Sequence, residues 1–182
     1  DVMQFGATVR ANLDAGIVGS VVDFVYASGD QNLDDGAQNG FKADPNFEVG
    51  MLLFRQLLAD HSARAVYTAG DPTLVGVPSE DLDRLPTRGS VTNTAALFPR
   101  IRVRPVAGLE IYTGPLFAWT GVPIADPLNT RIAGGAPRNY LGGQGGIHLG
   151  TEVDLGVRYR ALLWGAELTG GAEVGILKPG SA

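Results

Sequence analysis

The stretch from His148 to Arg160, HLGTEVDLGVRYR, constrains the fold of this chain more than any other part of it. Alternate residues from Leu149 to Tyr159 are apolar or neutral, whereas the residues between them include two acids and two arginines. A period of two residues indicates a β-strand with one apolar and one polar face. The stretch has thirteen residues, more than the about five or six of most soluble strands. It is long enough for a tilted strand across a bilayer, which needs about nine to eleven residues.

Composition is compatible with a membrane protein built from strands. The 182 residues fit one domain and include 26 glycines, 11 prolines and no cysteine, so disulfides and thiolate chemistry are excluded. The net charge of −5 argues against a protein that binds duplex nucleic acid, which would carry a basic patch. No apolar run reaches the roughly 18 residues of a transmembrane helix, but barrel strands carry apolar residues only at alternate positions.

The same alternation recurs along the chain and predicts six strands. Their expected ranges are 2–11, 17–28, 90–104, 109–120, 148–160 and 162–176. Short turns are expected near residues 14, 106 and 161, and long polar, glycine-rich loops over 29–89 and 121–147. Within the first loop, residues 47–59 show helical spacing and predict a short helix, with a buried strand as the alternative.

Alternating short and long connections are typical of outer-membrane barrels, which have short periplasmic turns and long extracellular loops. The sequence therefore predicts an all-β fold, an antiparallel up-and-down transmembrane β-barrel with a short helix in a long loop. Residues 1–182 would form one such domain or a fragment of a larger barrel. Six strands are fewer than the about eight of the smallest single-chain barrels, so we expect further strands or other chains to complete it. The alternative is a further hairpin supplied by residues 47–69.

The alternation also predicts which side chains face the lipid and which line the lumen. The outward set is Leu149, Val153, Leu155, Val157, Trp164 and Leu168. The lumen-lining set is Arg100, Arg102, Arg104, Glu110, Glu152, Asp154, Arg158, Arg160 and Glu167. A basic stripe would favour anions, whereas an internal salt-bridge lattice would only fill the barrel. We favour the lattice, because acids are at least as numerous as bases on the inward side of the later strands.

Tyrosines and tryptophans are candidates for an aromatic girdle at the two membrane interfaces. The residues are Tyr26, Tyr112, Trp119, Tyr159 and Trp164. Tyr112 fits this role least, because it shares the polar face of its strand.

Metal and catalytic motifs are weak. Asp30, Asn32 and Asp34 have the spacing of a calcium loop, but Asp35 and Phe41 stand where an EF-hand needs Gly and Glu. A looser calcium site on this acidic loop remains the one metal hypothesis. The two histidines lie far apart in sequence, without the paired spacing of a zinc site, and no Gly-x-Ser-x-Gly motif supports a hydrolase. We therefore predict no enzyme and no cofactor beyond this calcium.

The segment VYASGDQNLDDG, Val25 to Gly36, resembles a strand end and acidic loop of alginate-export-type outer-membrane porins. The stretches FEVGMLLFRQLLADHSARA and GGIHLGTEVDLGVRYR resemble outer-membrane barrel proteins of Gram-negative bacteria. The chain departs from a complete porin in its short length and in its final residues, Pro179 to Ala182, which lack the usual terminal aromatic. The resemblance implies an outer-membrane location and passage of an anionic or sugar-like solute.

The function expected from these observations is a porin-like channel for small polar or anionic solutes, with the lipid bilayer as the main partner. One alternative is a non-conducting barrel that anchors an envelope complex. The other is a soluble β-sandwich binding module, in which a second sheet would cover the apolar face.

Overall fold

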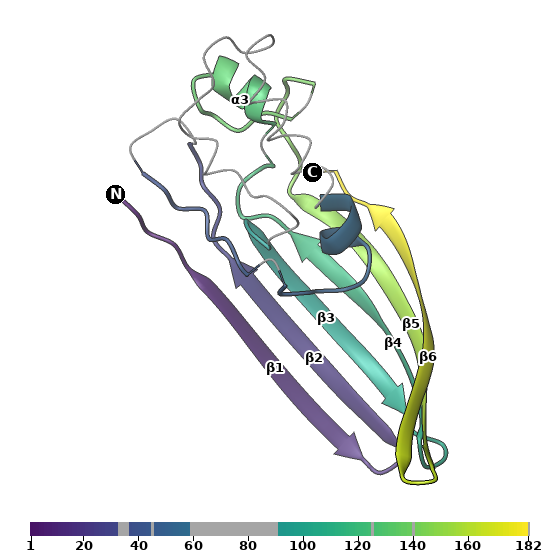
Figure 1. Cartoon of the computed structure of the whole chain (residues 1–182). Helices are drawn as coiled ribbons and strands as arrows, with labels where there is room; N and C mark the ends of the chain where they lie inside the picture. Colours follow the sequence, from purple (N-terminus) through teal and green to yellow (C-terminus); the bar gives the residue numbers. More distant parts are fainter. Residues whose placement is uncertain (33–36, 45, 59–90, 125, 140, 182) are drawn as a thin grey trace.

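The computed structural model describes residues 1–32, 37–44, 46–58, 91–124, 126–139 and 141–181. Its strands form one antiparallel sheet whose spatial order, β1-β2-β3-β4-β5-β6, is also the order of the chain (Figure 1). The bounds are β1 Gly6–Ala15, β2 Val18–Ala27, β3 Thr94–Val103, β4 Leu109–Trp119, β5 His148–Leu163 and β6 Ala166–Pro179. The predicted all-β, up-and-down architecture is confirmed. The sheet is not closed, because β1 and β6 form its two edges.

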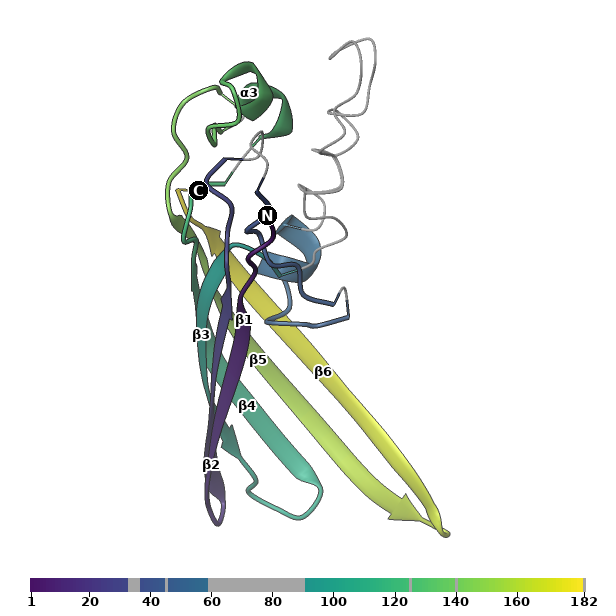
Figure 2. The same cartoon turned by 90° about the vertical axis from the view of Figure 1, so that its left-hand side faces the viewer.

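Short and long connections lie at opposite ends of the sheet, as predicted. The β1–β2, β3–β4 and β5–β6 turns lie at one end, which we call the turn end, and the long connections lie at the other, the loop end (Figure 1). Figure 2 shows that the sheet is twisted, with β5 and β6 running at a slant to β1 and β2.

The third turn lies further along the chain than the sequence predicted. Strand β5 continues through Leu163, and the turn consists of Trp164 and Gly165, with φ values of 49° and 82°. Positive φ at both central residues is what a tight type I′ hairpin requires. The predicted turn near residue 161 and the predicted strand position of Trp164 are therefore wrong, and Trp164 is fully exposed at the hairpin tip.

The two faces of the sheet differ in a way opposite to that of a soluble protein. The apolar face, here the outer face, is exposed, and its exposed members include Val22, Phe24, Leu97, Ile101, Ile111, Val153, Leu155, Val157, Val174 and Ile176. The opposite face, here the inner face, carries the charged residues and, nearer the loop end, a buried apolar cluster that includes Val25, Phe98 and Leu116. Its buried charged residues include Asp23, Glu152 and Asp154. The predicted alternation is thus confirmed over most of β5, and Leu168 on β6 is also exposed.

Leu149 is an exception to the predicted facing. The register between β4 and β5 shifts at this point, with Ala118 opposite Gly150 but Trp119 opposite His148. A β-bulge of this kind places an extra residue in one strand and reverses the alternation beyond it. Leu149 consequently turns inward and is only 6% exposed, so its predicted outward position is wrong.

Residues 47–58, the covering segment, pack on the inner face near the loop end and complete the core. Their buried apolar side chains include Leu53 and Phe54, which join Phe98, Leu116 and other residues of the sheet. The segment ends in a short π-helix, η1 (Leu53–Leu58), in which the N–H of Leu57 donates to the carbonyl of Leu52. The predicted helix is confirmed in position, although it is shorter than residues 47–59.

A second short helix, α3 (Pro127–Ile132), lies in the second long connection, where only loop was expected. The Asp126 carboxylate accepts a hydrogen bond from the N–H of Asn129 at 2.9 Å and so caps the helix. Among the described residues, no helix has both the length and the apolar character needed to cross a membrane.

Candidate functional site

The three predicted arginines of β3 lie on the inner face, and each pairs with an acid. Arg100 contacts Asp23, Arg102 contacts Asp14 at 2.5 Å, and Arg104 contacts Glu110 at 2.7 Å. Arg100 pairs with the neighbouring strand β2, whereas Arg102 reaches across Gly19 of β2 to Asp14 of β1. The basic stripe is therefore neutralised along much of its length.

A second group of ion pairs joins β5 to β6 nearer the turn end. Arg160 contacts Glu167 at 3.3 Å, and Arg158 lies 3.7 Å from Glu173. Glu173 also accepts a hydrogen bond from the Tyr112 hydroxyl at 2.5 Å. Together the two groups form the salt-bridge lattice that the sequence favoured over an uncompensated basic stripe.

Sequence reasoning did not name four members of this lattice as site residues. They are Arg10, Asp14, Asp23 and Glu173. Asp23 contacts two arginines, Arg10 at 2.6 Å and Arg100, and Asp14 likewise contacts two. The place of Arg10, Asp23 and Glu173 on the polar face was legible from the alternation, whereas Asp14 was expected in a turn and lies in β1. The partners of all four depend on the register between strands.

Glu152 joins no ion pair within the described part of the chain and instead binds the covering segment. One carboxylate oxygen, Oε1, accepts hydrogen bonds from the N–H groups of Met51 and Leu52, at 2.5 and 2.8 Å. The other, Oε2, accepts one from the N–H of Leu53 at 2.7 Å. The side chain is fully buried, and three N–H donors at the start of η1 stabilise its negative charge.

Gly50 allows this approach. Its φ is +68°, a conformation that favours glycine, and a Cβ added there would lie 2.6 Å from Leu116 Cδ2 and 3.1 Å from Glu152 Oε1. The covering segment can therefore approach the carboxylate closely only with glycine at this position.

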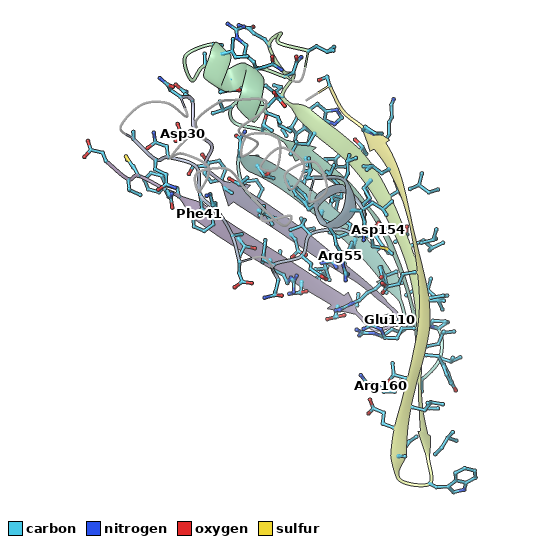
Figure 3. The ribbon with its side chains drawn as sticks, turned by 45° about the horizontal axis from the view of Figure 1, so that its top comes forward. Asp30, Phe41, Arg55, Glu110, Asp154 and Arg160 are labelled. Carbon is cyan, nitrogen blue, oxygen red and sulfur yellow. The ribbon has the colours of Figure 1, made fainter. Side chains whose placement is uncertain are left out.

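Asp154 lies two residues after Glu152 on the same face and is only 2% exposed. Its Oδ1 atom has no hydrogen-bond partner among the described residues. It lines a cavity of about 430 Å³ between the covering segment and the inner face. Figure 3 shows Arg55 of the covering segment and Asp154 on the same side of the sheet, with Glu110 and Arg160 nearer the turn end. All nine residues predicted to line a lumen thus lie on the inner face.

The predicted calcium loop is only partly described, because Asp34 lies outside the described residues. Both carboxylate oxygens of Asp30 accept backbone hydrogen bonds, from Asn32 at 3.1 Å and from Asn39 at 2.9 Å. Within the described part of the chain, no group of three or more His, Cys, Asp or Glu side chains is arranged to hold a metal ion. Asp30 therefore organises the loop backbone here.

The aromatic residues divide between the two ends of the outer face. Tyr26 and Trp119 lie in one cross-strand row at the loop end, each opposite Ala95 of β3. Tyr159 lies near the turn end, where Trp164 forms the hairpin tip. Tyr112 lies on the inner face, as its place in the alternation indicated.

One histidine belongs to the row at the loop end. His148 lies opposite Trp119, and their ring centroids are 6.1 Å apart. The bulge therefore places His148 on the outer face, contrary to its predicted polar side, while His61 lies outside the described residues.

A comparison of the chain with known protein families, curated proteins and solved structures finds no match.

Proposed function

We propose that this chain forms wall strands of a transmembrane β-barrel in an outer membrane, a porin-like channel for small polar solutes. The observation that carries the proposal is the inverted sheet, with an exposed apolar outer face and a charged inner face of which only part is buried. Water would make such an arrangement costly, because apolar surface is left exposed. A bilayer makes it favourable, since lipid-facing residues are apolar and lumen-facing residues are polar. The proposal assigns no catalytic role to the chain.

The dimensions of the outer face fit a bilayer. Strand β4 has 11 residues, so its length is about 34 Å at about 3.4 Å per residue. A tilt of about 45° reduces this to about 24 Å across the membrane, close to the about 25 Å apolar band of such barrels. Trp119 ends this strand and Tyr159 pairs with its first residue, so aromatic side chains flank the band at both ends.

The open edges support a barrel of more than these six strands. Every residue of β1 is exposed, and β6 is the other edge of the sheet. Unpaired backbone N–H and C=O groups in lipid cost several kcal/mol each, so an edge of this kind must pair with another strand in the membrane. We infer that strands from the same or another chain pair with β1 and β6.

The balance of charges on the inner face favours polar solutes over a strong preference for anions. All five predicted arginines lie within 4 Å of a carboxylate, so most of the positive charge on the inner face is compensated, although Arg10 and Arg100 share one carboxylate. The covering segment narrows the interior further. The same two features support the rival proposal, a non-conducting barrel that serves as an anchor, because a lattice and a cover can also fill a lumen.

Conductance separates the two proposals. The full chain is purified in detergent, tested for heat-modifiable migration on a gel, and added to a planar bilayer. Discrete current steps with weak ion selectivity are expected for the channel. Heat-modifiable migration without current steps would favour the anchor. A protein that stays monodisperse without detergent would contradict both, and would support the soluble binding module.

A further inference from the structure

The cavity beneath the covering segment has two poles of opposite charge. At one pole Arg10 and Arg100 share a single carboxylate, that of Asp23, which leaves one positive charge in excess. At the other pole stands Asp154, whose Oδ1 atom has no hydrogen-bond partner among the described residues. All four residues line the cavity, together with the Arg55–Glu48 ion pair and with Glu173, which adds a second carboxylate on the side of Asp154. Such a cavity complements a solute with two opposite charges better than one with a single charge.

The two poles lie in one row of the inner face and are separated by glycine. The β3–β4 register places Gly114 opposite Arg100, and the next ladders place Asp154 opposite Gly114 and Gly175 opposite Asp154. Adjacent strands lie about 4.8 Å apart, so the Cα atoms of Arg100 and Asp154 are about 10 Å apart. Gly114, which lies between them, projects no side chain, whereas the row continues beyond Arg100 with Val21 of β2.

Gly114 lies between the two charged residues, and Gly175 lies on β6 beyond Asp154. A Cβ on Gly114 would lie 2.7 Å from Arg100 Cγ, and a Cβ on Gly175 would lie 3.0 Å from Asp154 Oδ1. Any larger residue at either position would therefore displace one of the two charged side chains.

Asp154 supplies the second, independent observation. Its side chain is almost fully buried, yet its Oδ1 atom has no hydrogen-bond partner among the described residues. Buried polar atoms are nearly always hydrogen-bonded, since leaving one unpaired is costly. A protonated amine of a solute would satisfy this oxygen with a charge-assisted hydrogen bond.

We propose that this cavity binds small zwitterions, with the ammonium group at Asp154 and the carboxylate group toward Arg100. The inference rests on the proposed function and extends it, because it names the class of solute that binds inside the channel. A simple anion would meet Asp154 without compensation, and a simple cation would leave the Arg10–Arg100 pole unused. A metal ion fits less well, because no group of three ligating side chains converges in the described part of the chain.

Calorimetry on the detergent-solubilised full chain tests the proposal. The probes are 4-aminobutyrate, which carries both charges, and butyrate and butylamine, which carry one each. The zwitterion is expected to bind at least 10-fold more tightly than either analogue. Asp154→Asn is expected to weaken 4-aminobutyrate binding at least 10-fold and to leave butyrate binding undiminished. Arg100→Lys should retain part of the affinity, because it keeps the charge but not the planar fork.

Glu167→Gln serves as the matched control. It removes an inner-face carboxylate that lies outside the cavity and that pairs with Arg160 near the turn end. It should leave zwitterion binding within about 2-fold of the unmodified chain. Equal affinity for all three probes, or an Asp154→Asn variant that binds 4-aminobutyrate as well as the unmodified chain, would overturn the inference. Current steps without zwitterion binding would leave the channel standing and remove this inference. Zwitterion binding without current steps would leave this inference standing and remove the channel proposal.

Discussion

The contact between Glu152 and the covering segment gives the sharpest prediction. Glu152→Gln retains the size of the side chain but replaces a carboxylate oxygen with an NH2 group, which faces N–H donors. At least one of the three hydrogen bonds to residues 51–53 is then lost. Bonds to charged groups contribute about 1.5–3 kcal/mol each, and an unsatisfied buried donor adds to the loss. We expect the closed position of the covering segment to lose about 2–4 kcal/mol, or roughly 30- to 1,000-fold in its equilibrium.

Hydrogen exchange of the backbone amides of residues 51–58 measures this equilibrium. Their protection is expected to fall by at least about 30-fold in Glu152→Gln, while amides in the β3–β4 ladder keep theirs. Glu167→Gln is the matched control, because its ion pair with Arg160 is largely exposed and contributes about 0–1 kcal/mol. Unchanged protection at residues 51–58 would show that apolar packing alone holds the segment, and would refute the reasoning.

Three further predictions concern the faces of the sheet and the covering segment. Val157→Arg on the outer face should destabilise the protein in lipid vesicles by about 2–4 kcal/mol, measured by urea unfolding, whereas no loss would contradict lipid contact. Leu149→Ala should lower the free energy of unfolding by about 2–5 kcal/mol, because the bulge buries this side chain. It should lower the melting temperature more than Leu168→Ala does, because the Leu168 side chain is 62% exposed. Gly50→Ala should increase hydrogen exchange of the backbone amides of residues 51–53, because the positive φ and the close contact with Leu116 both oppose a Cβ. Unchanged protection of these amides would contradict the described geometry.

Period-two alternation predicted the strands and most of the facing because that pattern depends only on local sequence. The bulge at Leu149 was missed, since an extra residue in one strand is defined by its partner strand. The hairpin tip at Trp164 was placed wrongly because apolar residues continue through the end of β5, although the following Gly165 is a recognisable turn residue.

The candidate site depended on information that sequence reasoning lacked. The inner-face positions of Glu152 and Asp154 followed from alternation, but the Glu152 partners lie about 100 residues earlier in the chain. The pairing of Asp23 with two arginines likewise requires the register of β1, β2 and β3. The cap of α3 was legible as Asp126 followed by proline, but a six-residue helix gives too little periodicity to predict.

The carboxylate of Glu152 also implies an order of assembly. Each of the three hairpins closes over a turn of a few residues, so it can form early and alone. The covering segment precedes β3 in the chain, yet its N–H groups bond to β5, across a separation of 99 to 101 residues. Closing so long a loop is slow and requires β5 to be in place first. We therefore expect the covering segment to dock last, so that the inner face stays open to water while the six strands pair.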